Sequence, residues 1–203
     1  MKHSKKWFIE IGVGGSNTLY NLLNNGWYGI MIDANPRCFQ NIEEHPKLYK
    51  EICAIAPKNG RQNFLLVENI KRFEEPIAVL GMSGLEDGPT PLHDSTYNGH
   101  RFSVEVSTKR LDTIIQKYHL TEIEFLKIDV EGYDVPILLD YSFVIKPKMI
   151  KFEHIHYSGK VYDASANGFD QVKMTEDYYL LLEKLKDLGY VVWEENEDVY
   201  CIL

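Results

Sequence analysis

The stretch WFIEIGVGGSNTLYNLL, residues 7–23, decides the fold. It begins with the apolar run Trp7–Ile11, continues through residues 12–15 with three glycines, and then places apolar residues at helical spacing from Thr18 to Leu23. This order predicts a strand, a tight turn and a helix. A second unit of the same kind starts with the apolar run Tyr28–Ile32, so the chain begins as an α/β protein.

Strands and helices continue to alternate along the rest of the chain, which predicts a mostly parallel sheet covered on both faces. The polar turn Glu194–Asp198 joins the last two apolar runs and predicts a hairpin, which requires an antiparallel strand. The predicted fold class is therefore α/β, a doubly wound, mostly parallel sheet with an antiparallel last strand. The other predicted strands are Leu48–Ile55, Phe64–Val67, Ile77–Leu80, Phe102–Val106, Glu124–Val130, Met149–Ile155, Tyr190–Trp193 and Val199–Leu203, and the other helices follow Asn35-Pro36 or cover Leu111–Tyr118 and Tyr178–Leu188.

Length and composition narrow the function classes. The 203 residues are predicted to form one domain, residues 1–203, and 30 acidic against 22 basic residues disfavour nucleic acid as the main partner. The cysteines Cys38, Cys53 and Cys201 lack the spacing of metal ligands. We interpret them as small buried residues of a protein in a reducing compartment. Glu10 interrupts the N-terminal apolar run, so we expect no signal peptide, no membrane span and a cytoplasmic location.

The glycine turn is the predicted cofactor site, because ligands of open parallel sheets bind at the carboxyl ends of the strands. A dinucleotide fingerprint would have a third glycine where Asn17 stands, so that match fails. Glu10 lies two residues before Gly12, where we expect its carboxylate to face the ligand. A carboxylate there repels phosphates and attracts an ammonium and a sulfonium, which favours S-adenosylmethionine.

Asp33 ends the second predicted strand 21 residues after Gly12, where an acid accepts both ribose hydroxyls of an adenosine. NAD would use the same acid, so a nicotinamide-dependent oxidoreductase remains an alternative. The backbone at Ala54, after the third strand, is predicted to contact the adenine. The predicted cofactor-binding residues are Glu10, Gly12, Gly14, Gly15, Asn17, Asp33, Ala34, Asn35, Ala54 and Asp129.

Polar groups at the ends of two later strands are the predicted catalytic groups. In an extended chain Lys127, Asp129 and Glu131 share one face, and charges in a buried strand either pair or serve a site. The next strand ends in a histidine that could accept a hydroxyl proton and a glutamate that could orient the acceptor. A metal site from Asp129, Glu131, His154 or His156 stays open, but the spacing matches no metal motif and none is predicted. The predicted catalytic residues are Asp129, Glu131, Glu153 and His154.

The segment LKIDVEG, residues 126–132, resembles the FkbM family of S-adenosylmethionine-dependent methyltransferases. Residues 110–113, RLDT, precede it and residues 152–154, FEH, follow it in the order typical of that family. The resemblance implies a class I methyltransferase fold, which is Rossmann-like, and methyl transfer to a hydroxyl oxygen, commonly on sugars or polyketide-type natural products. The glycine turn departs from the family's D-x-G-A-N-x-G, because Glu10, Gly14 and Ser16 stand at the positions of its Asp, Asn and last Gly.

Two long polar segments, Ser83–Arg101 and His156–Met174, do not fit the alternation of strands and helices. Loops of this length in a compact domain are usually functional, so we interpret them as lids over the acceptor site. The predicted partner is a hydroxylated small molecule or a carbohydrate. A non-catalytic protein that keeps the cofactor fold and binds a partner protein remains the alternative from another class.

Overall fold

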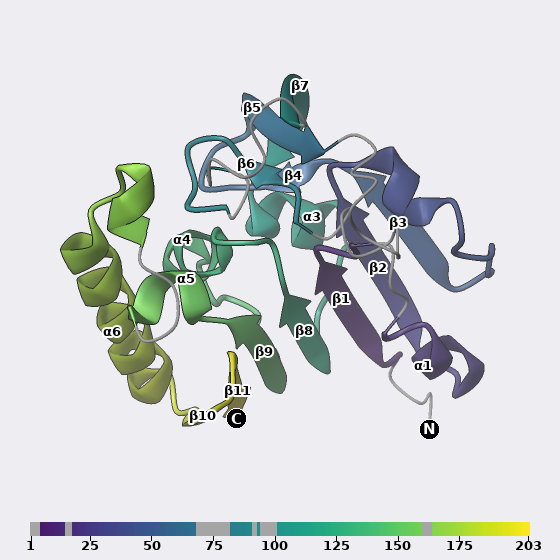
Figure 1. The fold of residues 1–203 in the computed structure, drawn as a ribbon. Coiled ribbons are helices and arrows are strands. Elements are labelled where there is room, and N and C mark those ends of the chain that lie inside the picture. The colour runs from purple at the N-terminus through teal and green to yellow at the C-terminus, as the bar shows by residue number, and fades with distance from the viewer. Residues whose placement is uncertain (1–4, 15–17, 68–81, 91–92, 94–100, 160–163) are drawn as a thin grey trace.

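The computed structural model describes residues 5–14, 18–67, 82–90, 93, 101–159 and 164–203, and its main sheet contains seven strands (Figure 1). These strands are β1 (Trp7–Ile11), β2 (Tyr28–Asp33), β3 (Leu48–Ile52), β8 (Phe125–Ile128), β9 (Met149–Glu153), β10 (Val191–Glu195) and β11 (Asp198–Ile202). Their order across the sheet is β10-β11-β9-β8-β1-β2-β3. The five strands from β9 to β3 are parallel, whereas β11 is antiparallel to both of its neighbours. The prediction of a mostly parallel sheet with an antiparallel last strand is confirmed.

Helices cover both faces of the main sheet. The larger core contains buried side chains from α3 (Leu111–Lys117), α4 (Asp134–Asp140) and α6 (Gln171–Asp187), packed with one face of the strands. A smaller core on the other face contains side chains from α1 (Asn21–Asn24) and the 3₁₀ helix η1 (Pro36–Phe39). Sheet residues alternate between the two cores, as β1 shows with Phe8 in the smaller and Ile9 in the larger. The remaining short helices are α5 (Ile155–Ser158) and η4 (Ala164–Asn167).

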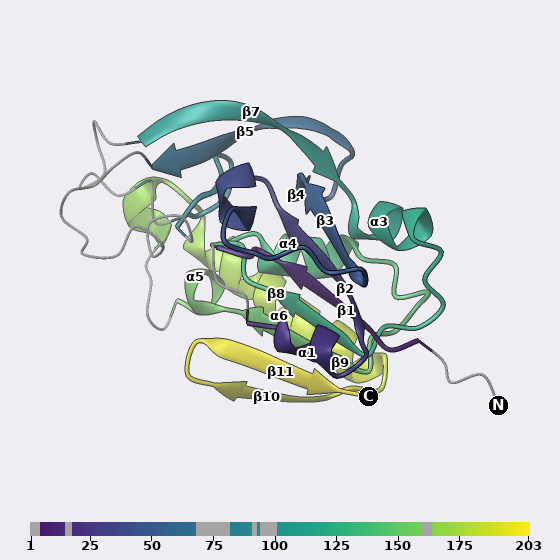
Figure 2. The same cartoon turned by 90° about the vertical axis from the view of Figure 1, so that its right-hand side faces the viewer.

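A second sheet, which the sequence pattern did not predict, lies along the side of the molecule opposite the β10–β11 hairpin (Figure 2). Its strands are β4 (Ala54–Ile55), β5 (Gly60–Val67), β6 (Gly84–Leu85) and β7 (Arg101–Lys109), in the order β4-β7-β5-β6. The predicted third strand is therefore divided. Because β2 ends at Asp33, the chain pairs with β2 only as far as Ile52 and then pairs with β7 from Ala54.

Other element boundaries also differ from the predictions. The helix after the glycine turn is four residues long, and β9 ends at Glu153 because the chain turns there into α5. Helix α4 was not predicted, since Pro136 lies within it, but a proline in the first turn removes an N–H that has no partner inside the helix. The predicted strand Ile77–Leu80 lies outside the described residues. None of the helices in the described part of the chain is long and apolar enough to cross a membrane.

Glu51 on β3 provides a test of how this side of the fold depends on pH. Its buried carboxylate accepts hydrogen bonds from Lys109 (3.0 Å), Lys117 and Tyr118. Burial alone would raise the pKa of Glu51, but these three donors together lower it to about 2. A lowered carboxyl pKa stabilises the fold above the unfolded value of about 4.3, and this contribution is lost as the pH falls towards 2.

We therefore expect Glu51→Gln to remove part of the acid sensitivity of the protein. Between pH 5 and pH 2, the free energy of unfolding should fall by about 1 kcal/mol more in the wild type than in the variant. The difference is kept this small because Lys117 is half-exposed and solvent screens its charge. Urea unfolding at a series of pH values measures the difference. Parallel curves for the two proteins would show that Glu51 does not contribute.

Candidate functional site

The glycine turn after β1 is pressed against the end of β8. Gly12 has φ +80°, and a Cβ atom there would lie 1.6 Å from the backbone oxygen of Asp129. Gly14 also has a positive φ, of 58°. Only glycine fits at Gly12, because a side chain there would collide with the backbone of Asp129. That backbone cannot move away easily, since the Asp129 N–H donates to the oxygen of Ile11 on β1 at 2.9 Å. Gly15 and Asn17, the other predicted cofactor residues of this turn, lie outside the described residues.

Asp33 at the end of β2 holds the glycine turn in place. Its Oδ2 accepts the backbone N–H groups of Val13 (3.0 Å) and Gly14 (3.1 Å), and its Oδ1 accepts that of Asn35 (2.8 Å). Burial raises the pKa of Asp33, and these N–H groups act in the opposite direction. Each carboxylate oxygen has two lone pairs. The Cys38 thiol is a further donor, so Asp33 uses most of its accepting capacity on groups of the protein itself.

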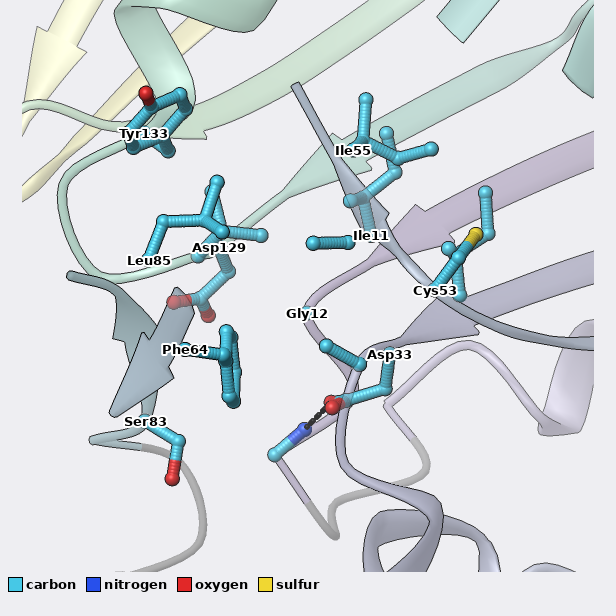
Figure 3. A pocket seen from close by; sticks show the side chains of 15 residues that line it. Ile11, Gly12, Asp33, Cys53, Ile55, Phe64, Ser83, Leu85, Asp129 and Tyr133 are labelled. Atoms are coloured by element: carbon cyan, nitrogen blue, oxygen red, sulfur yellow. Dashed lines mark hydrogen bonds between the residues drawn. The ribbon is translucent and has the colours of Figure 1, made fainter. Parts of the chain in front are cut away.

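A cavity lies between the carboxyl ends of β1 and β2 and the second sheet (Figure 3). Its wall is mostly apolar and carries two carboxylates, those of Asp33 and Asp129. Six of the predicted cofactor residues line it, namely Gly12, Gly14, Asp33, Ala34, Ala54 and Asp129, and sequence reasoning missed Ile11, Ile32, Cys53, Ile55, Phe64, Ser83, Leu85, Val130 and Tyr133. Asn35 is buried and accepts the N–H of Arg37 at 3.0 Å, so it caps η1 and does not line the cavity.

Glu10 does not face the cavity, contrary to the sequence-based expectation. Alternation along β1 turns its side chain to the opposite face of the sheet from Ile9 and Ile11, and there it is fully buried. Its Oε1 lies 3.2 Å from Lys127 Nζ and accepts the hydroxyl of Thr18. Burial raises the pKa of Glu10, and Lys127 and Thr18 partly offset that effect. Glu10 thus links β1, β8 and the chain after the turn beneath the site.

Of the three charged residues predicted to share one face, Lys127 and Asp129 stay together, and the loop after β8 turns Glu131 away from them. Lys127 pairs with Glu10 below the turn and lies 3.5 Å from Asp129, whose half-exposed side chain belongs to the cavity wall. Glu131 has φ +54° and Gly132 has φ +101°, so the loop turns sharply there. A bend of this kind directs the Glu131 side chain away from Lys127 and towards the end of β9.

Glu131, Glu153 and His156 form a cluster at the carboxyl ends of the adjacent strands β8 and β9. His156 Nε2 lies 3.4 Å from Glu131 Oε2 and 3.2 Å from Glu153 Oε2. Burial alone would lower the pKa of His156, but the two carboxylates together raise it to about 9. Burial raises the pKa of Glu131, while His156 lowers it. The cluster is thus a pair of carboxylates held together by an imidazole.

Of the two histidines near β9, the structure places His156 in this cluster and His154 outside it. The His154 ring stacks on Tyr178 at 5.4 Å between centroids and is 2% exposed, and its nitrogens make no hydrogen bond with the described residues. Sequence reasoning selected His154 because it extended β9 to Ile155. The chain becomes helical after Glu153, and residues three apart on a helix are neighbours. The i, i+3 spacing of Glu153 and His156 is therefore the feature of the sequence that could have identified His156.

The described parts of the two predicted lids contact the site and each other. A Cβ atom on Gly88 would lie 2.6 Å from the Tyr133 ring, and one on Gly132 would lie 2.7 Å from the Pro89 ring. The His93 ring lies 5.1 Å from that of Phe169, which joins the first segment to the second. Residues 91–92, 94–100 and 160–163 of these segments lie outside the described residues.

One comparison with known proteins identifies a family for the chain. The model of the methyltransferase FkbM domain matches residues 10–192, which include every element of the fold except β11 and parts of β1 and β10. Searches of curated proteins and of solved structures found no match. The matched residues cover most of the chain and contain both the cavity and the carboxylate–histidine cluster. The chain therefore belongs to the FkbM family of methyltransferases.

Proposed function

We propose that the protein is an S-adenosylmethionine-dependent O-methyltransferase with the Rossmann-like arrangement of the class I enzymes. One observation carries the proposal: residues 129–133 contribute Asp129, Val130 and Tyr133 to the cavity at the glycine turn and Glu131 to the cluster with His156. A cofactor in the cavity and a proton acceptor in the cluster would therefore share one loop. The strand order, with the antiparallel β11 between β9 and β10, supports the same assignment.

The residues of the cavity fit this cofactor. Gly12 and Gly14 bring backbone without side chains to the part of the wall where the methionine end would lie, and the Asp33 carboxylate lies in the wall where a ribose would bind. Apolar side chains such as Ile55, Phe64 and Leu85 offer flat or aliphatic surface to an adenine. The carboxylate of Asp129 would attract the ammonium and sulfonium charges.

When bound, the cofactor supplies a methyl group on a cationic sulfur, whose C–S bond breaks with its electron pair going to sulfur as the C–O bond to the acceptor forms. The chain must then position the acceptor hydroxyl and take its proton. Glu131 and Glu153 are the groups placed to do this, with side chains 20% and 15% exposed beside the buried His156. His156 holds the two carboxylates at a fixed separation and is a positioning residue.

The proposed acceptor is a hydroxyl of a sugar, a glycan or a natural-product-like molecule. Carboxylates accept hydrogen bonds from hydroxyl groups, and the rings of Tyr133 and Phe169 offer flat surfaces that suit a sugar ring. The net charge of −8 argues against RNA. Methyl transfer from labelled cofactor to glycans, polyhydroxylated small molecules and RNA compares these classes, and salt-sensitive methylation of RNA alone would contradict the assignment.

Cofactor binding gives the direct test of the proposal. We expect S-adenosylmethionine to raise the melting temperature, because a ligand at a hundredfold excess over its Kd stabilises the native state by about 2.7 kcal/mol. Asp33→Ala should lose most of this shift, since the turn and the ribose both depend on that carboxylate. Asp177→Ala, on an exposed pair with Lys173 on α6, serves as the control and should keep the shift. A shift with NADH and none with S-adenosylmethionine would favour an oxidoreductase instead.

A further inference from the structure

The cluster of Glu131, Glu153 and His156 has the composition and spacing of a metal site. One oxygen of each carboxylate and one nitrogen of the imidazole all lie within 4.8 Å of one another. Donor atoms bound at about 2.0–2.2 Å to a common ion lie about 3.0–3.5 Å apart. The separations of 3.4 Å and 3.2 Å from His156 Nε2 fall in that range.

Charge around the cluster also favours a cation. Asp134 at the start of α4 is 1% exposed, and its Oδ1 accepts the N–H of Glu153 at 3.3 Å. Its Oδ2 makes no hydrogen bond within the described part of the chain. In the same part of the chain, no lysine or arginine forms an ion pair with Glu131, Glu153 or Asp134. Two partly buried carboxylates therefore flank the imidazole, and the buried Asp134 lies against the backbone of Glu153 beside them. A buried carboxyl group is costly without a partner.

We propose that Glu131, Glu153 and His156 bind a divalent first-row cation. The donor set of one imidazole and two carboxylates suits Mn²⁺ or Zn²⁺ better than Ca²⁺, which prefers oxygen alone. Three protein ligands leave coordination positions open, as in catalytic metal sites. Because the imidazole is buried and the carboxylates are partly exposed, those positions face the outside of the cluster, where an acceptor oxygen can bind.

The cation would orient the acceptor hydroxyl and favour its ionised form, while the oxygen of Glu131 that does not bind the cation would take the proton. This role rests on the proposed methyltransferase function, whereas the cation site itself does not. The two are therefore measured separately, with cation binding in the absence of cofactor and cofactor binding in the presence of a chelator.

The test is titration of the chelator-treated protein with Mn²⁺, with free Mn²⁺ followed by electron paramagnetic resonance. We expect one saturable site per chain, and Glu131→Gln and Glu153→Gln should each weaken binding about tenfold or more. Glu105→Gln is the matched control, because Glu105 pairs with Arg61 on the exposed second sheet, and it should bind Mn²⁺ like the wild type. No saturable binding, or equal binding by all three variants, would overturn the proposal.

A second measurement keeps the proposal testable if the glutamine variants do not fold. In the wild type, substoichiometric Mn²⁺ should broaden the ring signals of His156 in proton NMR before those of His119, which lies beyond the end of α3. Broadening of His119 first would contradict the site. If S-adenosylmethionine binds and Mn²⁺ does not, the cation site is wrong and the proposed function stands. If Mn²⁺ binds and S-adenosylmethionine does not, the cation site stands and the proposed function is wrong.

Discussion

Replacing Glu131 by glutamine is expected to lower the rate of methyl transfer by about 10²- to 10⁴-fold, the usual contribution of a general base. The affinity for S-adenosylmethionine should stay within about threefold, since Glu131 belongs to the cluster and not to the cavity wall. The physical reason is that glutamine keeps the shape of the side chain and loses the charge that accepts the proton. Single-turnover methyl transfer and calorimetry of cofactor binding measure the two effects separately.

The two histidines after β9 provide the control for this experiment. His156→Gln should also lower turnover, because the imidazole that holds both carboxylates is removed. His154→Phe should keep turnover within about threefold, since phenylalanine retains the ring that stacks on Tyr178. If His154→Phe abolishes turnover and Glu131→Gln does not, the base lies on the α6 side of β9 and the cluster is not the catalytic centre.

How well the sequence predicts an element of the fold depends on how far apart along the chain its interacting residues lie. Apolar runs located β1, β2, β8 and the hairpin of β10 and β11, because strand formation there follows a local pattern. The second sheet could not be found in this way, since β5 pairs with β7 in a register that joins Gly60 to Thr108. Nothing in the local pattern of either segment specifies a partner so far along the chain.

The sequence identifies residues that line the cavity where their position follows from the end of a strand. Asp33, Asp129 and Ala54 line the cavity because each lies where a strand of the main sheet has just ended. The role expected of Glu10 failed, since the alternation that makes β1 a strand also turns this side chain to the opposite face. His156 was passed over because one turn of helix after Glu153 changes which side chains are neighbours, and a strand pattern does not reveal that change.

Lys127→Met should destabilise the protein by about 3–5 kcal/mol, because it breaks a buried ion pair by removing one partner. The ammonium group of Lys127 lies 3.2 Å from Glu10 Oε1 and 3.2 Å from the hydroxyl of Thr18, and both Glu10 and Lys127 are buried. Removal of the lysine leaves the Glu10 carboxylate buried in the sheet without a cationic partner among the described residues, although Thr18 and the Leu19 N–H still donate to it. The free energy of unfolding measured in urea gives the loss.

Lys151→Met on β9 is the matched control, because Lys151 is the register partner of Lys127 on the neighbouring strand and pairs with Asp198 at 2.7 Å. That pair is about one-quarter exposed, so its loss should cost less than about 1 kcal/mol. The double variant with Glu10→Met and Lys127→Met should recover much of the stability, since apolar side chains of similar volume replace a buried ion pair at little cost. Equal losses for Lys127→Met and Lys151→Met would show that the buried pair contributes no more than a surface pair. That result would indicate that Lys127 does not mainly stabilise the sheet. Its function would then be to hold the Asp129 carboxylate, 3.5 Å away, in the cavity wall.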